Sequence, residues 1–442
     1  MSMFRSNNGV PRMRQLSSKR STTISVLDIG TSKICCLIAR LRPREESLLL
    51  PGRSHRVEVL GIGHQRSFGI KSGVVVDLDA AEHAIRHAVD AAERMAEVTV
   101  DSLIVNVSSG RLSSDTYSAT VTLDGHEVED SDIRRVLNAG SAHARQDGRT
   151  VVHSIPIGYA LDNDTGFSDP RGLEGQLLGV DMHIVNAESG PLRNLELCIN
   201  RAHLSVEAMV ATPYASGLSA LVDDEAEMGC ACIDMGGGTT TLSVFLGGRF
   251  VFTDAIAVGG GHVTMDLARG LSTRLDDAER LKVLHGSTLP GASDEQDMIS
   301  IPPIGDDDGD VPLQVPRAQV TRIIRPRIEE TLELIRDRLN RSGFAGAVGK
   351  RIVLTGGASQ LTGMSEVARR ILTRNVRLGR PLGVKGLPEM AKGPAFSTAV
   401  GLLIYPQIAQ IEQFCTAPSG RNQLTGTDGT IDRVVRWLKE SL

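Results

Sequence analysis

The sequence contains one short pattern twice, and this duplication strongly limits what the chain can fold into. Residues 230–245, CACIDMGGGTTTLSVF, form an apolar run that ends in Asp234, followed by glycines, threonines and a second apolar run. Residues 25–41, SVLDIGTSKICCLIARL, repeat this order around Asp28. Apolar runs on both sides of a glycine-rich turn predict two strands joined by a tight hairpin. Two matched hairpins predict two similarly built domains that face each other across a cleft.

The residues at the two turns indicate phosphate binding. Glycines let backbone N–H groups approach an anion closely, and threonine hydroxyls add donors. An acid two residues before each turn can hold a hydrated divalent cation beside the phosphates. The pattern is not a Walker motif, which needs a Gly-Lys-Ser/Thr run that opens a helix. A hairpin without a ligand is the alternative for one copy alone. Lys33 either adds a cation near the phosphates or solvates its turn.

Composition restricts the class of protein. The chain has 442 residues, 41% of them apolar and 23% charged, as in a soluble protein of two or more domains. Aromatic residues make up only 3% and the net charge is -5, so we expect no nucleic-acid partner. The six cysteines form no CxxC pair and lie mainly in strand-like runs, which favours a reducing, cytosolic compartment. No apolar run approaches the ~20 residues that span a bilayer.

The distribution of apolar and polar segments predicts a mixed α/β chain of several units. Between the hairpins, a strand–helix–strand–strand–helix–strand block predicts an inserted α+β subdomain in the first half. An acidic, Pro/Gly-rich stretch at 286–316 predicts a loop with at most short edge strands. The predicted units are a disordered basic arm (1–21), a first core domain (22–76 and 161–212), the insertion (77–160), a second core domain (213–264 and 346–410), its small subdomain (265–345), a linker (411–430) and a terminal helix (431–442).

Two further motifs offer chemistry to the same cleft. Glu279 and Lys282 lie three apart on a predicted helix, where they form a surface salt bridge or present a carboxylate and an ammonium to a ribose. The segment RIVLTGGASQLTG predicts a buried strand, a turn at Gly356 and Gly357, and a helix start. Bare backbone at these glycines lets an adenine ring lie against it. A tight turn without a ligand is an equally good interpretation of this motif alone.

The last twelve residues, IDRVVRWLKESL, have the pattern of a helix that lies in a membrane interface. On a helix, an apolar stripe has an aromatic at its edge and basic flanks. Docking of this helix on the protein body is the alternative, which the preceding polar linker disfavours. The residues predicted to meet the membrane are Val434, Val435, Leu438 and Leu442 of the stripe, which also includes Ile431, the edge residue Trp437, and the flanking Arg433, Arg436 and Lys439.

These motifs together resemble the actin-like ATPase superfamily and, within it, the FtsA family of bacterial cell-division proteins. The resemblance rests on LDIGTSK (27–33), IDMGGGTT (233–240), AERLK (278–282) and LTGGAS (354–359), on the inserted block and on the terminal helix. It covers about residues 22–405 and the C-terminal tip. It implies a two-domain actin-like ATPase fold in which the insertion replaces one actin subdomain.

The resemblance also implies ligands and partners. It implies an ATP-binding protein that self-associates, works with other division proteins and anchors filaments of FtsZ, bound through the FtsZ C-terminal tail, to the cytoplasmic membrane surface at the division septum. The FtsZ tail is expected on the small subdomain, about residues 265–345. The implied nucleotide-binding residues are Gly30, Thr31, Ser32, Lys33, Gly236, Gly237, Gly238, Thr239, Thr240, Glu279, Lys282, Gly356, Gly357 and Ala358, and Asp28 and Asp234 are implied to face Mg²⁺, through water.

Two other functions share the hairpins. One is an ATP-dependent small-molecule kinase of the same superfamily, which needs a general base in the cleft, and no acid in the sequence has a context that demands this role. The other is an actin-like protein of pilus assembly, which the insertion and terminal helix disfavour. No water-positioning residue is identifiable, so we expect at most a slow ATPase in which nucleotide binding is regulatory.

Overall fold

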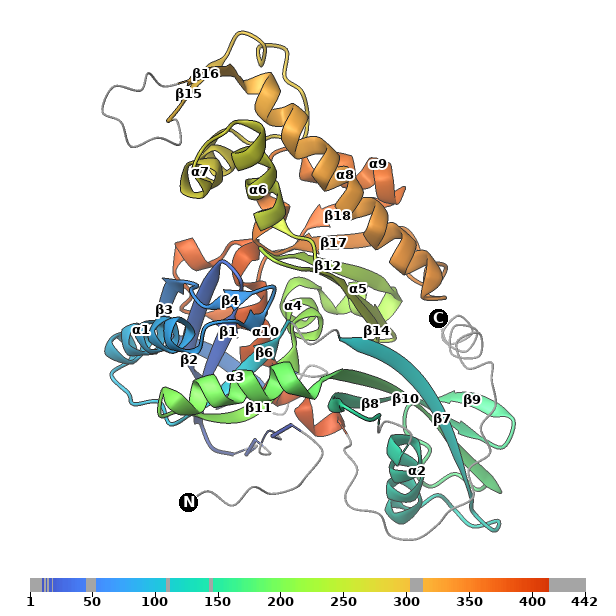
Figure 1. Ribbon diagram of the computed structural model, residues 1–442. Coiled ribbons are helices and arrows are strands. Elements are labelled where there is room, and N and C mark those ends of the chain that lie inside the picture. The colour runs from blue at the N-terminus through green and yellow to red at the C-terminus, as the bar shows by residue number, and fades with distance from the viewer. Residues whose placement is uncertain are drawn as a thin grey trace.

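The computed structural model describes residues 10–11, 13, 16–17, 19–44, 53–108, 112–142, 146–302 and 313–412. In this part of the chain, two core domains lie one above the other in Figure 1. A smaller unit extends from the lower domain, and a helical unit stands on the upper one. The structure therefore has the mixed α/β, two-domain architecture that the duplicated hairpins predict.

The first core domain is built on a six-stranded sheet with the order β11-β6-β1-β2-β3-β19. Strands β1, β2 and β3 form an antiparallel meander, and β6 and β11 run parallel to β1. Helices α1 and α3 pack together on one face, beside the short β4–β5 hairpin. The elements are β1 (Thr22–Ile29), β2 (Lys33–Pro43), β3 (His55–Arg66), β4 (Ile70–Lys71), β5 (Val74–Val75), α1 (Leu78–Ala96), β6 (Ser102–Val107), α3 (Ser189–Arg201), β11 (Ser205–Ala211) and β19 (Val384–Lys385).

Helix α1 is an integral part of this first domain. Asp77 caps it by accepting hydrogen bonds from the N–H groups of Asp79 and Ala80. Its buried alanine face lies against β3, where glycines permit close approach: a Cβ at Gly63 would lie 1.9 Å from the carbonyl oxygen of Ala88. This contact explains why the helix packs on the six-stranded sheet and not with the insertion.

The insertion has its own antiparallel sheet, in the order β7-β10-β8-β9, and its own small apolar core under helix α2. Its predicted limits, 77–160, are wrong at both ends. Helix α1 and strand β6 belong to the first sheet, while β10, predicted in the first core domain, pairs with β7 and β8. The elements are β7 (Ser113–Thr122), α2 (Asp130–Ala142), β8 (Arg149–Leu161), β9 (Asp164–Phe167) and β10 (Leu177–Glu188).

The second core domain repeats the topology of the first. Its sheet has the order β14-β13-β12-β17-β18, again a meander of three antiparallel strands followed by two parallel ones. Strand β12 therefore corresponds to β1, and β17 to β6. The elements are α5 (Asp223–Met228), β12 (Cys230–Met235), β13 (Thr240–Leu246), β14 (Arg249–Ile256), β17 (Arg351–Thr355), η2 (Gly357–Gln360), α9 (Met364–Leu372) and β18 (Asn375–Leu378).

The helical unit at the top of Figure 1 contains α6, α7, α8 and the two-stranded β15–β16 sheet. It includes the stretch predicted as an acidic loop with short edge strands, of which residues 303–312 lie outside the described residues. The long helix α8 runs from this unit down across the second sheet. The elements are α6 (Gly260–Gly270), α7 (Leu275–His285), β15 (Met298–Ile301), β16 (Leu313–Pro316) and α8 (Arg317–Arg341).

A layer of helices α4 and α10 lies between the two sheets. Helix α10 packs on β1 and β2 of the first sheet, and α4 packs on β12 and β13 of the second. The helices touch closely, since a Cβ at Gly401 would lie 1.7 Å from the carbonyl oxygen of Ala215. The elements here are α4 (Thr212–Ala220), η3 (Glu389–Ala391), η4 (Pro394–Phe396), α10 (Ser397–Ile404), η5 (Tyr405–Gln407) and η6 (Ala409–Ile411).

Both ends of the described chain differ from the prediction. Val10 and Leu16, in the arm predicted as disordered, are buried against the main core. Glu412, at the start of the predicted linker, is buried and accepts a 2.9 Å hydrogen bond from Nδ1 of His153 on β8. The rest of the linker and the predicted helix 431–442 lie outside the described residues. Among the residues described, no helix combines the length and apolar character needed to cross a membrane.

Candidate functional site

A cavity of about 510 Å³ lies between the two core domains, within the usual size range of small-ligand sites. The two hairpin turns, the first turns of α6 and η2, helix α7 and the start of α10 border it. All but one of the predicted ligand residues line it: Asp28, Gly30, Thr31, Ser32, Lys33, Asp234, Gly236, Gly237, Gly238, Thr239, Glu279, Lys282, Gly356, Gly357 and Ala358. The fold therefore brings four separate sequence motifs to one place.

The two hairpin turns have the same backbone closure. The N–H of Gly30 donates to the carbonyl of Lys33 at 3.0 Å, and the N–H of Gly236 donates to that of Thr239 at 2.9 Å. Their tips meet: a Cβ at Gly237 would lie 2.1 Å from Oγ of Ser32. The second tip is therefore glycine because the first occupies the space that a side chain would need.

Thr240 is the predicted residue that does not line the cavity. Its hydroxyl donates to the carbonyl of Val258 at 2.8 Å, and the side chain is fully buried. Side chains alternate along a strand, so Thr241 of β13 lies on the side opposite to Thr240. Thr241 lines the cavity, although the sequence interpretation did not select it.

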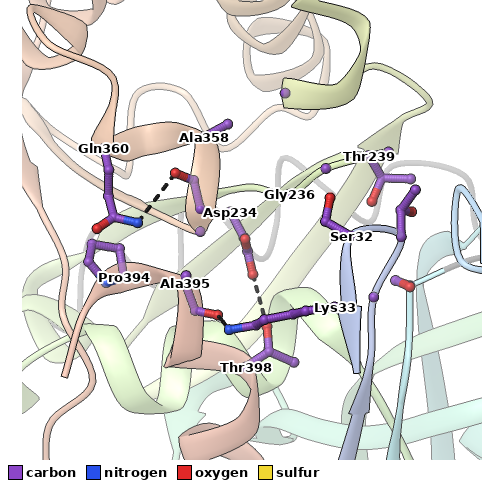
Figure 2. Close-up of a pocket in the computed structure, with 18 of the residues that line it drawn as sticks. Ser32, Lys33, Asp234, Gly236, Thr239, Ala358, Gln360, Pro394, Ala395 and Thr398 are labelled. Carbon is purple, nitrogen blue, oxygen red and sulfur yellow. Dashed lines mark hydrogen bonds between the residues drawn. The ribbon is translucent and has the colours of Figure 1, made fainter. Parts of the chain in front are cut away.

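Two buried carboxylates, Asp28 and Asp234, border the cavity at equivalent positions of β1 and β12. Burial raises the pKa of Asp28 from 3.8 to about 7; the ammonium of Lys33 opposes this rise and the carboxylate of Asp234 adds to it. Burial also raises the pKa of Asp234, against hydrogen bonds from the hydroxyls of Thr398 and Ser216. The bond from Thr398, 3.0 Å long, is drawn in Figure 2. The site thus concentrates negative charge that a cation would stabilise.

The ammonium group of Lys33 is buried and contacts other protein groups, so it does not solvate its turn. Figure 2 shows its side chain reaching from the first hairpin to the carbonyl oxygen of Ala395, which accepts a short hydrogen bond from Nζ. Nζ also lies 3.2 Å from the ring centroid of Phe396, a cation–π contact. Burial lowers the pKa of Lys33, while Asp28 raises it. A phosphate in the cavity would compete for this cation.

The helices α6 and α7 form a second wall. Lys282 donates to Glu279 at 2.6 Å, so the predicted ion pair is confirmed, and Nζ also reaches the carbonyl of Gly260 and the hydroxyl of Thr264. The N–H of Gly260 in turn donates to the carbonyl of Gly236 at 2.9 Å. The ion pair therefore fixes the first turn of α6 against the second hairpin while bordering the cavity.

The two glycines after β17 have different environments. Gly356 has a φ of +84°, and a Cβ there would lie 2.3 Å from Oδ1 of Asp234, so close approach to β12 requires glycine. A Cβ at Gly357 would meet only the Cβ of Ala395, at 3.8 Å. Gly357 therefore leaves flat backbone open to the cavity, as the adenine prediction needs.

Several lining residues were missed because they come from helix starts and strand ends without a motif. Asn106, at the end of β6, accepts a 2.6 Å hydrogen bond from the N–H of Ile29 and donates to Thr212 at 3.1 Å, which fixes the end of β1. Ala395 belongs to η4, and Thr398 belongs to the first turn of α10. The parallel pairing of β6 with β1, which the structure shows, brings Asn106 to the same sheet edge as Asp28, since parallel strands end at the same edge. The residues not predicted are Asn106, Ser108, Thr212, Thr241, Gly260, Val283, Gly286, Gln360, Leu361, Thr362, Pro394, Ala395 and Thr398.

The donor set suits magnesium only together with a ligand. In the described part of the chain, no group of three or more His, Cys, Asp or Glu side chains could hold a metal ion. Magnesium usually binds through one or two carboxylates, several waters and substrate phosphates. Two buried carboxylates beside glycine-rich turns that border the cavity fit that requirement once a phosphate ligand is bound.

The duplicated sheets and the facing hairpins define the actin-like ATPase class, and solved structures show the same fold. The PilM-PilN type IV pilus biogenesis complex is similar with a TM-score of 0.59 and 14% identity, covering 87% of this chain and 98% of that one. MreB5 of Spiroplasma citri has a TM-score of 0.52 and 13% identity, covering 89% and 98%. At these identities the likeness shows the fold alone.

Sequence comparison then gives the family. The model "Cell division protein FtsA" matches residues 231–401, and "SHS2 domain inserted in FTSA" matches residues 109–186. The cell division protein FtsA of Agrobacterium fabrum is 65% identical over all of both chains. That of Escherichia coli is 30% identical, covering 94% of this chain and 97% of its own length. The chain belongs to the FtsA family of cell-division proteins, as its motifs predicted, rather than to the pilus or kinase alternatives.

Proposed function

We propose that the cavity binds ATP, with the phosphates between the hairpin tips and the adenine over Gly357. The observation that carries this proposal is the convergence of both hairpins, the α6–α7 wall and the η2 turn on one cavity. Backbone N–H groups at Gly237 and Gly238, the hydroxyls of the first turn and Lys33 would hold phosphate, and Glu279 and Lys282 would meet the ribose. The similar MreB5 was solved bound to ADP, which supports a nucleotide in this class of cavity.

Magnesium would accompany the nucleotide beside Asp28 and Asp234. When bound, the ion neutralises phosphate charge and fixes the orientation of the phosphates. The two aspartates would hold it through its water shell, since each side chain is anchored by a strand and borders the cavity. A bound cation would also keep Asp28 ionised at neutral pH, against the effect of burial.

We expect turnover to be slow. Orienting an attacking water requires a free acceptor at the phosphate end of the cavity. Among the lining amides, Oδ1 of Asn106 already accepts a hydrogen bond from the N–H of Ile29, and no residue of the sequence is identifiable as the one that positions water. Single-turnover measurement with labelled ATP tests this, and a rate above about 1 per second, within the usual enzyme range, would contradict it.

The cellular role that we propose is a peripheral adaptor at the cytoplasmic side of the inner membrane, which self-associates in an ATP-dependent way and tethers FtsZ filaments at the division septum. Family membership supports the division role. The amphipathic pattern of residues 431–442 supports membrane attachment. A helix this short binds a bilayer weakly, so self-association would raise its avidity.

Recruitment of FtsZ filaments to lipid vesicles tests the tether. With Mg-ATP, the full chain should bring FtsZ filaments to vesicles, and deletion of residues 432–442 should abolish recruitment while leaving ATP binding intact. Trp437→Glu should have nearly the same effect, because it places a charge in the interface, and Trp437→Phe is the matched control. Undiminished flotation of the truncated protein with vesicles would refute the tether.

The FtsZ tail is proposed to bind the unit that contains α6, α7 and α8. Helix α7 exposes Val283 and Leu284 there, at 69% and 64% of their surface, and exposed aliphatic neighbours favour a partner surface. Leu284→Glu should weaken binding of an FtsZ tail peptide. Met390→Glu, at an equally exposed apolar residue elsewhere, should leave it unchanged. Equal binding by parent and Leu284→Glu would place the peptide elsewhere.

A further inference from the structure

Thr241 carries a buried hydroxyl that the fold leaves without a hydrogen bond. The residue is 2% exposed, and its Oγ1 has no partner among the described atoms. Buried hydroxyls in native proteins are almost always paired, because leaving one unpaired is costly. Thr241 borders the cavity between the domains. An unpaired polar group at that place points to a ligand.

The strand register fixes which way Thr241 faces. In the β12–β13 pair, Thr241 is directly opposite Asp234, and directly opposed residues of antiparallel strands project from the same face of the sheet. Asp234 also borders the cavity. Thr240, the next residue, faces the other way and donates to Val258. The Thr241 side chain therefore stands beside the Asp234 carboxylate.

Other buried hydroxyls around the cavity already have partners. Thr398 donates to Asp234, and the hydroxyl of Thr212 accepts from Asn106. These side chains position protein groups. Thr241 differs because nothing in the described part of the chain uses its hydroxyl.

The neighbouring charge selects the kind of ligand. A carboxylate beside Thr241 repels phosphate oxygens and attracts a cation with its water shell. The phosphate-binding turn, Gly236 to Thr239, lies closer to the tip of the hairpin than the Asp234–Thr241 pair. A threonine hydroxyl can accept a hydrogen bond from a metal-bound water.

We propose that the Thr241 hydroxyl binds the hydrated magnesium ion of Mg-ATP, beside Asp234. This proposal rests on the proposed function, since it concerns the same cavity. It adds a magnesium-binding residue that neither hairpin motif identifies. It also gives a reason for keeping an unpaired hydroxyl in the ligand-free protein.

Thr241→Val tests the proposal, because valine keeps the shape and removes the hydroxyl. We expect Mg-ATP affinity, measured by calorimetry on the full chain, to fall about three- to ten-fold, the effect of one hydrogen bond. ATP affinity in EDTA should change less than about two-fold. The Tm of the ligand-free protein should stay equal or rise, because an unpaired polar group has been removed. Thr241→Ser should restore Mg-ATP binding.

Thr321→Val is the matched control, since Thr321 on α8 also has a buried hydroxyl without a partner but does not border the cavity. Its Mg-ATP affinity should equal that of the parent. Unchanged Mg-ATP affinity in Thr241→Val would overturn the proposal. An equal loss of ATP affinity in Thr241→Val with and without magnesium would also overturn it. So would a lowered Tm or a failure of that variant to fold, or a Thr241→Ser variant that does not regain Mg-ATP binding. If the parent itself binds no Mg-ATP, the proposed function fails first.

Discussion

The two hairpins that form the cavity share a backbone and differ in what they offer a ligand. Both place an aspartate two residues before the turn, and both turns close with the same hydrogen bond. The turn of the first hairpin presents Thr31, Ser32 and Lys33, whereas the turn of the second presents the backbone of three glycines, followed by Thr239. The tip of the second hairpin has no room for side chains, since Gly237 lies between Ser32 and the first turn of α6. The same secondary structure thus supports two different roles at the two tips, with side-chain donors at the first and glycine amides at the second.

The residues opposite the two aspartates extend this contrast. Cys35 is opposite Asp28, and burial raises the pKa of its thiol to about 12, so it stays neutral and apolar. Thr241 is opposite Asp234 and keeps an unpaired hydroxyl. The pairs differ because β2 is covered by α1 and α10, while the start of β13 borders the cavity. The second hairpin therefore adds to the site further along its strand than the first.

The largest expected effect is that of adding a side chain at Gly237, in the tip of the second hairpin. Gly237→Asp should reduce ATP affinity more than about 100-fold, because it adds bulk against Ser32 and negative charge where we propose that the phosphates bind. Calorimetry with Mg-ATP measures the loss. Gly190→Asp is the control, at an exposed glycine with open space for a side chain. Near-normal affinity in Gly237→Asp would show that the second hairpin does not hold phosphate.

The two aspartates should contribute unequally to the pH dependence of stability. The pKa of Asp28 is about 7 in the folded protein and 3.8 otherwise, so between these values the folded state holds a proton that the unfolded chain has lost. The free energy of unfolding therefore falls as the pH rises from about 4 to about 7. In Asp28→Asn, the decrease in the free energy of unfolding between about pH 4 and about pH 7 should be smaller than in the parent by about 2–4 kcal/mol. Urea denaturation of the ligand-free protein measures this difference.

Asp234→Asn is the comparison for that experiment. Hydroxyl groups of Thr398 and Ser216 stabilise the ionised carboxylate of Asp234 and oppose the effect of burial. We therefore expect a smaller change in the slope than for Asp28→Asn. A larger change in Asp234→Asn would reverse the assigned asymmetry between the two hairpins.

The cation of the first hairpin should have an intermediate effect. Lys33→Met should weaken ATP binding about ten- to 100-fold, the range for a charged hydrogen bond. Lys71→Met removes an exposed cation from β4, outside the cavity, and should leave affinity unchanged. A change of less than about two-fold in Lys33→Met would mean that Lys33 serves only its contacts with Ala395 and Phe396.

The smallest expected effect is that of alanine at the first glycine of each turn, and it tests whether the two turns are equivalent. A Cβ at Gly30 would lie 3.0 Å from the carbonyl oxygen of Lys33, and one at Gly236 would lie 3.0 Å from that of Thr239. Gly30→Ala and Gly236→Ala should each change the free energy of unfolding by about 1 kcal/mol or less, and by the same amount. Thermal or urea unfolding of the two variants measures this. A difference above about 1.5 kcal/mol would show that the turns are not equivalent.

The sequence predicted the parts of the site that are local. Gly30 and Gly236 lie in turns that the flanking strands define, and Glu279 and Lys282 share a helix face, so their spacing was sufficient. It did not predict that β10 pairs with β7 and β8, or that β19 extends the first sheet. Strand pairing between distant segments leaves little trace in either segment, because an apolar alternation fits many partners.

The limits of the insertion show the same difference. Helix α1 has clear caps and a clear apolar face, yet nothing in its own sequence says which sheet it covers. The deciding contact is the approach of its alanine face to Gly61 and Gly63 on β3. Such contacts depend on packing across long chain separations, and only the folded structure displays them.

The amino-acid sequence by itself determined the duplicated hairpins, the two aspartates, the family and the pattern of the terminal segment, because turn chemistry and side-chain periodicity are local properties of the chain. The tertiary structure decided that Thr398 and Ala395 complete the site, that Thr240 faces away from it and that Thr241 faces it with an unpaired hydroxyl. These outcomes depend on strand register and on how two domains close around α4 and α10, which no short motif encodes.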